Sequence, residues 1–337
     1  MRIVVVGSGV AGVTFAEKYR ALSPEADVVL ITNEHDGYYS RPLLSRGFTK
    51  ADIEQTIILK SFEKLREGGI EVMINTEVNS IERLDKTITV TNQGSEKRLS
   101  YDTLILALGS TAFIPPPFRP FEKLFYGLNS LADLKAMRSF RRTFIDQNIK
   151  PHWAIIGGGL IGCEVASDLA VAGDKVTVFH AMDRLMERQL VAEDSATLFS
   201  ILTNSGVEVL LDQAVQSFDE AGEKKCINTD INTEYDAIIV ACGFKPRTDL
   251  AEAAGLEVGR GIKVNDFLQT SDAAIYALGD AAQLPSGKLY AYILPIRSQA
   301  LWLANHLAGQ EQVAWSPAPF STKAKVHGFE ATHPYNL

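Results

Sequence analysis

Two glycine-rich segments of the same spacing could bind phosphate. Residues 7–12 read Gly-Ser-Gly-Val-Ala-Gly and residues 157–162 read Gly-Gly-Gly-Leu-Ile-Gly, and apolar runs at 3–6 and 153–156 precede them. In such a turn the first glycine bends the chain, the second admits a pyrophosphate and the third lets a helix pack on the strand, with the helix N-terminus facing the anion. We therefore predict two bound dinucleotides, contacted by Gly7, Ser8, Gly9, Ala11 and Gly12 and by Gly157, Gly159, Leu160, Ile161 and Gly162.

The residue that ends the next strand normally reads the ribose of the dinucleotide. An acid there accepts the ribose hydroxyls of NAD, whereas basic residues suit the phosphate of NADP. After the second glycine segment this place is taken by His180, with Asp183 three residues later and Arg184 and Arg188 beyond it. After the first glycine segment it is taken by Thr32, so Glu34 is our candidate ribose ligand, with a simple loop acid as the alternative.

Composition indicates an ordinary globular protein. The 337 residues suffice for two or three domains. Charged residues are 22% and hydrophobic residues 46%, without an apolar run near the roughly 18 residues that a spanning helix needs. A net charge of −8 disfavours a general nucleic-acid binder. Because the first predicted strand starts at Arg2, we expect no signal peptide and a cytoplasmic location.

Cysteine use points to a reducing compartment. Cys163, Cys226 and Cys242 are odd in number and far apart, so a disulfide framework and a Cys-x-x-Cys pair are disfavoured. Cys163 is expected to pack against the strand, because a small thiol on the helix after the glycine turn suits that place. We expect no metal site.

The pattern of strands and helices divides the chain into a discontinuous first domain, residues 1–110 and 241–315, and a second domain, 111–240. The segment 109–120 holds four prolines and predicts a connector. Residues 316–337 begin a further domain. The predicted strands lie at 28–32, 70–74, 78–81, 87–90, 104–107, 175–179 and 237–241, and the predicted helices run from the glycine turns to Leu22 and Ala172 and from Ile296 to Leu307.

Four further motifs extend the pattern over nearly the whole chain. They are LILALGS at 104–110, IIGGGLIGCE at 155–164, ACGFKPRTDL at 241–250 and SDAAIYALGD at 271–280. Taken singly, ILALG is a buried strand ending in a turn and Asp280 a helix cap. In this order, however, the motifs resemble flavin-dependent pyridine-nucleotide reductases. YYSRPLLS at 38–45 and YILPIRSQA at 292–300 are most similar to rubredoxin reductases, to the reductase of flavorubredoxin and to the flavin module of nitrite reductase.

The resemblance implies an α/β fold with two Rossmann-like domains, one for FAD and one for NAD(P), the FAD domain being discontinuous. It also implies a C-terminal α+β domain, which we expect to be incomplete because the sequence stops at Leu337. The reductases that the chain resembles use NADH, so NADH is the expected substrate and NADPH the alternative. Further implied contacts are Glu34, Arg41, Pro42, Val78, Ala107, Gly109, Gly279, Asp280, Pro295 and Lys323 for FAD and Glu164, His180, Asp183 and Gly243 for NAD.

Many reductases of this fold pass electrons to a cysteine in the loop that follows the first nucleotide strands. Residues 38–47 contain Ser40 and Ser45 but no cysteine, so thiol-based mechanisms lack their nucleophile. We therefore expect an external electron acceptor. Flavin links hydride donors to one-electron carriers, which suits rubredoxin or a similar small iron protein.

Three residues are the predicted catalytic group. By resemblance to ferredoxin reductases, Arg41 and Arg46 lie on the N5 side of the flavin and Glu164 approaches from the nicotinamide domain. We predict an ion pair between Glu164 and one of these arginines. Those reductases have lysine at position 46, and because arginine hardly deprotonates we favour an electrostatic role over proton donation. The alternative is a solvated arginine pair. The helix after Pro295 is predicted to direct its positive end at the flavin.

Two other functions remain open at this stage. One is an NADH oxidase that uses oxygen directly, and the other is a flavoprotein that binds or senses nicotinamide, as apoptosis-inducing factor does. An acceptor protein would be expected to dock on a basic patch around Arg41, Arg46 and Lys323.

Overall fold

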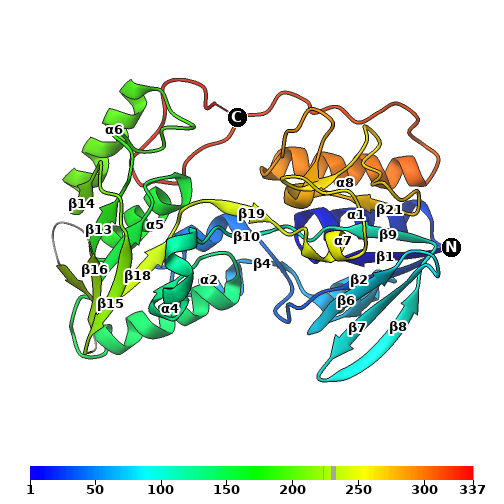
Figure 1. The fold of residues 1–337 in the computed structure, drawn as a ribbon, viewed down its shortest axis with the longest axis horizontal. Coiled ribbons are helices and arrows are strands. Elements are labelled where there is room, and N and C mark those ends of the chain that lie inside the picture. The colour runs from blue at the N-terminus through cyan, green and yellow to red at the C-terminus, as the bar shows by residue number, and fades with distance from the viewer. Residues whose placement is uncertain (223, 229–232, 337) are drawn as a thin grey trace. The chain divides into compact units, whose positions relative to one another are not determined.

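The computed structural model describes residues 1–222, 224–228 and 233–336 (Figure 1). The chain divides into two compact units, and it crosses between them several times. Unit 1 consists of Met1–Ser40, Ile58–Thr111 and Lys245–Phe320, and unit 2 of Arg41–Ile57, Ala112–Phe244 and Ser321–Leu337. The domain bounds expected from the sequence were 110/111, 240/241 and 315/316, and the sequence did not indicate that residues 41–57 group with unit 2.

Unit 1 is built on a five-stranded parallel sheet in the order β21-β9-β1-β2-β5. Ile3, Val4 and Val5 of the central strand are fully buried, because helices and loops cover both faces of a parallel sheet. Val4 pairs with Val29 on one side and Leu104 on the other. The strands are β1 (Arg2–Val6), β2 (Asp27–Ile31), β5 (Glu71–Met73), β9 (Thr103–Leu106) and β21 (Ile275–Ala277).

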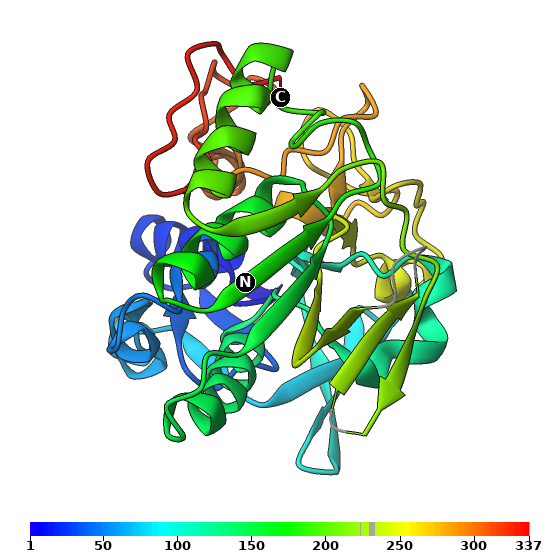
Figure 2. The ribbon, with the colours of Figure 1, turned by 90° about the vertical axis from the view of Figure 1, so that its left-hand side faces the viewer.

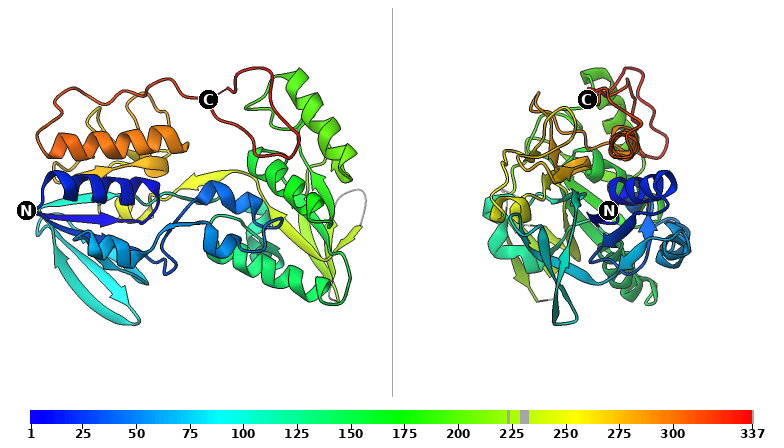
Figure 3. Two further views of the ribbon diagram at one scale, coloured as in Figure 1. Left: turned by 180° about the vertical axis from the view of Figure 1, so that it is seen from behind. Right: turned by 90° about the vertical axis from the view of Figure 1, so that its right-hand side faces the viewer.

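Two long helices of unit 1 pack against each other, α1 (Val10–Leu22) and α8 (Ile293–Leu307), as Figure 3 shows in blue and orange. An antiparallel meander, β6-β7-β8, leaves the parallel sheet. The remaining elements of unit 1 are β3 (Tyr38–Tyr39), β4 (Ile58–Lys60), α3 (Phe62–Glu67), β6 (Thr76–Glu82), β7 (Thr87–Asn92), β8 (Ser95–Ser100), α7 (Asp249–Ala253), β20 (Ile262–Lys263), η3 (Gly279–Ala281) and β22 (Ala282–Gln283).

Unit 2 repeats the plan with a parallel sheet in the order β11-β18-β12-β13-β14 and a meander, β15-β16-β17. Helix α6 packs beside β14, as Figure 2 shows. The elements are η1 (Arg41–Arg46), α2 (Ile53–Thr56), η2 (Pro116–Leu124), β11 (Phe125–Tyr126), α4 (Leu131–Ile145), β12 (His152–Ile156), α5 (Leu160–Val171), β13 (Lys175–Phe179), α6 (Ala192–Asn204), β14 (Val207–Leu210), β15 (Ser217–Ala221), β16 (Lys224–Asn228), β17 (Thr233–Tyr235) and β18 (Ala237–Val240). Two of the crossings fall within β10 (Ser110–Ala112) and β19 (Phe244–Pro246), which pair with each other.

The helices that follow the two glycine turns match the sequence prediction closely, whereas the long helices α4 and α6 were not predicted. Two further differences have physical causes. Helix α8 begins at Ile293 rather than Ile296, because Pro295 sits in the first turn, where its missing N–H would have no partner within the helix. Strand β8 was not predicted, since its sequence is polar and mostly exposed. In the part of the chain that the structure describes, no helix is long and apolar enough to cross a membrane.

The C-terminal segment 321–336 packs on unit 2 without forming a helix or strand. Asp194 on α6 accepts hydrogen bonds from the backbone N–H groups of Thr332 and His333, both at 3.0 Å. These bonds, with those from the two side chains, lower the pKa of Asp194 to about 2. The red end of the trace lies beside the green helix α6 in Figure 2.

Asp174, which lies in the turn between α5 and β13, joins two elements of unit 2. Its buried carboxylate accepts hydrogen bonds from Arg141 Nε on α4 at 2.7 Å and from Trp153 Nε1 on β12 at 2.9 Å. Because β12 leads into the second glycine turn, this carboxylate helps to hold the strand that positions that turn.

We predict that Asp174→Asn destabilises unit 2 by about 3–5 kcal/mol, because it removes the buried anion that pairs with the half-buried Arg141 guanidinium. Urea unfolding followed by tryptophan fluorescence would measure this. The control is Asp249→Asn, which removes an exposed partner of Lys245 and should cost about 1 kcal/mol or less. Equal losses in the two variants would contradict the role given to Asp174.

Candidate dinucleotide-binding sites

The first glycine turn in unit 1 leaves no space for side chains at its ends. A Cβ added to Gly7, whose φ is +111°, would lie 2.2 Å from the carbonyl oxygen of Ala107, and one added to Gly12 would lie 1.9 Å from that of Gly7. At Gly9, by contrast, an added Cβ would meet nothing within 4 Å. The turn is thus closed against the sheet and open in front of α1.

The second turn, in unit 2, has the same construction. A Cβ on Gly157 would lie 2.5 Å from the oxygen of Ala241, and one on Gly162 would lie 1.9 Å from that of Gly157. Gly159 again faces open space. Two segments 150 residues apart therefore form equivalent cradles.

The cradles fit a phosphate. Gly9 and Gly159 are the N-caps of α1 and α5, and neither helix has a side-chain hydrogen bond at its N-terminus. Helix α4, in contrast, is closed by a capping box from Ser130 and Asp133. The free N–H groups and the helix dipole favour an anion, so the pyrophosphates of FAD and of a nicotinamide dinucleotide suit these two places.

The predicted adenosine side of the first cradle is assembled by hydroxyl groups. Ser8 Oγ and Thr32 Oγ1 lie 2.8 Å apart and are both buried. Thr32 Oγ1 also accepts the N–H of Glu34 at 3.1 Å, and Tyr39 donates its hydroxyl to Glu34 Oε1 at 2.7 Å. The carboxylate of Glu34 is therefore held beside the end of β2, as a ribose ligand requires.

The predicted flavin side of unit 1 is formed around Gly279 and Asp280. Ser110 Oγ donates to Asp280 Oδ2 at 2.7 Å, and Gly279 N–H donates to Gln299 Oε1 at 2.9 Å. Gln299 lies on α8 and is fully buried, so its side chain holds the turn at Gly279 against this helix. The other predicted FAD contacts also lie in unit 1. Ala107 directly follows β9, and Gly109, two residues further, has φ +67°. Pro295 is buried in α8, and Val78 lies on β6.

His180, at the end of β13, is an internal brace. Its Nδ1 accepts the N–H of Gly158 at 3.0 Å, and its Nε2 lies 3.0 Å from the carbonyl oxygen of Arg184 and 3.2 Å from Glu187 Oε2. Because Nδ1 accepts, the hydrogen-bond network assigns the proton to Nε2 of a neutral ring. Asp183, the acid predicted from the sequence, is exposed, as is Ile161, while Leu160 is half-buried and Gly243 has φ +114°.

Glu164 on α5 is fully buried and has two side-chain partners. Lys325 Nζ lies 2.6 Å from its Oε1, and Ser45 Oγ donates to its Oε2 at 2.5 Å. The backbone N–H of Lys325 adds a third bond at 2.8 Å. The predicted ion pair of Glu164 with Arg41 or Arg46 is therefore wrong: the cation comes from the C-terminal segment.

The two arginines have other roles in unit 2. Arg46 Nε donates to the carbonyl oxygen of Lys325 at 2.9 Å, so it positions the lysine rather than the carboxylate. Arg41, which is exposed, donates to the carbonyl oxygen of Asn129, and Pro42 follows it in η1. Lys323 forms an exposed ion pair with Glu330 at 2.7 Å. The contacts of Arg41, Pro42 and Lys323 with FAD stay predictions.

The cysteines have the character of packing residues. Burial raises the pKa of Cys163, and the nearby Glu164 adds to this; its thiol donates to the carbonyl oxygen of Gly158 at 3.3 Å. Burial also raises the pKa of Cys242, to about 11. All three cysteines are free thiols. At neutral pH Cys163 and Cys242 are therefore protonated and poor nucleophiles.

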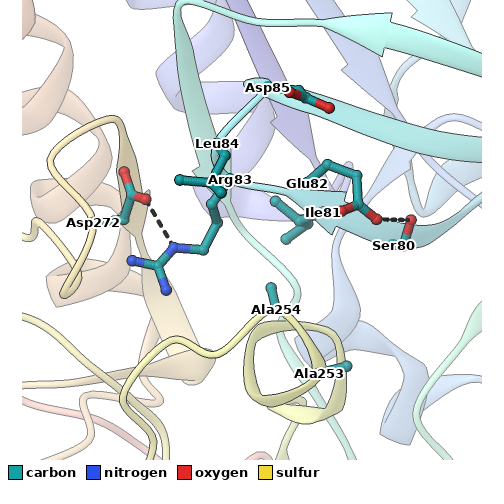
Figure 4. A pocket seen from close by; sticks show the side chains of 9 residues that line it. All are labelled: Ser80, Ile81, Glu82, Arg83, Leu84, Asp85, Ala253, Ala254 and Asp272. Atoms are coloured by element: carbon teal, nitrogen blue, oxygen red, sulfur yellow. Dashed lines mark hydrogen bonds and ion pairs between the residues drawn. The ribbon is translucent and has the colours of Figure 1, made fainter.

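A cavity of about 560 Å³ lies elsewhere in unit 1, between the turn after β6 and helix α7 (Figure 4). Arg83 points across it and forms an ion pair with Asp272 at 2.8 Å, and its NH1 donates to Gly255. Burial, with a contribution from Asp272, raises the pKa of Tyr101 nearby to about 12. Because none of the predicted dinucleotide contacts lines this cavity, we treat its ion pair as a brace for the meander.

Sequence reasoning missed four residues that organise these sites: Ser45, Glu187, Gln299 and Lys325. Each acts through a partner that is distant in the sequence or lies in a loop, so no periodicity marks it. Ser45 and Gln299 lay within quoted motifs, but neither was given a role in the site, and Ser45 was named only as a substitute for cysteine.

Comparison with known proteins agrees with this geometry. The model of the family described as pyridine nucleotide-disulphide oxidoreductase matches residues 1–303. The chain is 32% identical to the rubredoxin-NAD(+) reductase of Alcanivorax borkumensis, covering 95% of this chain and 82% of that protein. It is 31% identical to the nitric oxide reductase FlRd-NAD(+) reductase of Vibrio vulnificus, covering 97% and 83%.

Among solved structures, the covalent putidaredoxin reductase–putidaredoxin complex matches with a TM-score of 0.84 and 26% identity, covering 97% of this chain and 79% of that chain. The two parallel sheets, the paired glycine cradles and these similarities extend over nearly the whole sequence. The chain belongs to the pyridine nucleotide-disulphide oxidoreductase family, whose members use FAD and a nicotinamide dinucleotide.

Proposed function

We propose that this protein oxidises NADH and passes the electrons, by way of FAD, to a small iron protein of the rubredoxin type. Bound FAD would accept a hydride and release electrons one at a time. The relatives named as rubredoxin and flavorubredoxin reductases support this acceptor class.

The observation that carries the proposal is the composition of the loop after β2. Residues 33–57 contain no cysteine, and Cys163 and Cys242 have raised pKa values. A disulfide or thiolate relay in this loop therefore lacks its sulfur, which favours transfer of the reducing equivalents to a partner outside the chain.

We assign FAD to the cradle of unit 1 and the nicotinamide dinucleotide to that of unit 2. Asp280 and Gln299 support the first assignment, because they fix a turn at the carboxyl end of the sheet. In unit 2 Glu164 lies on the helix that begins at the cradle, where its carboxylate, neutralised by Lys325, would orient the nicotinamide ring. Arg46 would act by holding Lys325.

The direct test is a two-step stopped-flow experiment with the FAD-loaded protein. We expect NADH to bleach the flavin absorbance and oxidised rubredoxin to restore it in a second mixing step. The second step should slow as salt rises if the acidic carrier docks on the exposed cations of unit 2, whereas the first should change little. Rapid reoxidation by oxygen alone would instead support an NADH oxidase, and a persistent charge-transfer band without reoxidation would support a binding or sensing module.

Removal of the thiols should leave both steps intact. We predict that a variant with Cys163→Ala, Cys226→Ser and Cys242→Ser reduces flavin and carrier at rates within about twofold of the native protein, since neither buried thiol is ionised. Alkylation of the native protein with iodoacetamide gives the matched chemical control. Normal flavin reduction with lost carrier reduction would contradict the proposal.

Replacing Glu164 should affect hydride transfer selectively. We predict that Glu164→Gln slows flavin reduction by NADH about tenfold or more, because it removes the anion that fixes Lys325 and Ser45. The rate would be measured by stopped flow at saturating NADH. Glu257→Gln, which removes the exposed partner of Lys263, is the control and should leave the rate unchanged. An unchanged rate in Glu164→Gln would exclude the role of this carboxylate.

A further inference from the structure

The second cradle departs from the usual pattern at the place where the adenosine ribose is read. An acid about 20 residues after the glycine turn normally accepts the ribose hydroxyls. Here His180 occupies that place, and both of its ring nitrogens are engaged within the protein. A Cβ on Gly158 would lie 2.8 Å from His180 Cγ, so the imidazole fills the space beside the turn. His180 therefore cannot offer a carboxylate or a free ring nitrogen to a ribose.

The structure brings a carboxylate to the same place from further along the chain. The N–H of Met186 donates to the carbonyl oxygen of Gly158 at 2.9 Å, which ties the loop after β13 to the cradle. Glu187 follows directly, and its Oε2 lies 3.2 Å from His180 Nε2. Its side chain is 20% exposed, so the carboxylate is oriented by the imidazole and still accessible.

The neighbouring arginines differ in their availability. Arg184 is committed to the protein: its NH1 donates to the carbonyl oxygen of Leu190 at 2.7 Å and to Ser195 Oγ at 3.0 Å, and its NH2 donates to the carbonyl oxygen of Glu187 at 2.8 Å. Its guanidinium thus holds the backbone of Glu187 in place. Arg188 is 85% exposed, and its Nε lies 3.5 Å from Glu187 Oε1.

We propose that Glu187 is the residue that selects the unphosphorylated coenzyme, accepting the adenosine ribose hydroxyls in place of an acid at the strand end. His180 and Arg184 are its positioning residues. A 2′-phosphate at this place would meet the carboxylate of Glu187 rather than a guanidinium pair, because the guanidinium of Arg184 is bonded within the protein and only Arg188 is left beside Glu187. This inference rests on the proposed function, because it assumes that unit 2 binds the nicotinamide dinucleotide.

The test measures binding alone, with ADP-ribose and 2′-phospho-ADP-ribose titrated calorimetrically into the FAD-loaded protein. We expect the native protein to bind ADP-ribose at least about tenfold more tightly than the 2′-phosphorylated form. In Glu187→Gln, which keeps the side-chain shape and the bond from His180, this ratio should fall about tenfold. Unfolding midpoints equal to that of the native protein would show that the fold is retained.

Two further variants make the outcomes decisive. Glu193→Gln removes one exposed negative charge from the start of α6 and should leave the ratio unchanged. If Asp183→Asn lowers the ratio and Glu187→Gln does not, Asp183 is the residue that distinguishes the two ligands, and the proposal is overturned. Equal binding of both ligands by the native protein would also overturn it, with the proposed function intact. Failure of the native protein to bind either ligand would instead contradict the proposed function.

Discussion

The contact of one helix backbone with the preceding turn sets the geometry of both dinucleotide sites. At Gly12 and again at Gly162, the space for a Cβ is taken by the carbonyl oxygen of the first glycine of the turn. This close approach presses the N-terminus of each helix to the carboxyl edge of its sheet, where the free N–H groups face open space. The proposed ribose ligands, the buried Glu164 and the bracing hydrogen bonds are all arranged around these two points.

The fold could be predicted from the sequence because its signals are local. A glycine turn between an apolar strand and an Ala/Val-rich helix identifies itself within about 20 residues, and the chain contains two. The bounds of α1, α5 and β13 follow from this pattern. Strand β8 was not predicted, because Glu96, Lys97 and Arg98 give a polar, mostly exposed strand that pairs with β7.

The site was predicted less well, because its interactions join distant segments. Glu164 does pair with a basic side chain, but the sequence prediction named Arg41 or Arg46 as that partner and was wrong. The lysine that pairs with it lies 161 residues later, in a segment that forms neither helix nor strand. Neither periodicity nor propensity indicates which of Lys323 and Lys325 turns inward. That choice depends on backbone hydrogen bonds such as those to Glu164 and Asp194.

The packing of His180 against Gly158 links two positions that are 22 residues apart. Any larger residue at 158 would collide with the imidazole, and a smaller residue at 180 would leave the amide of Gly158 without its acceptor. The two sites are thus epistatic, and we expect homologous sequences to exchange them as a pair. A redesign that alters coenzyme choice by replacing His180 alone would therefore remove the acceptor of the Gly158 N–H and disturb the glycine turn that binds the coenzyme.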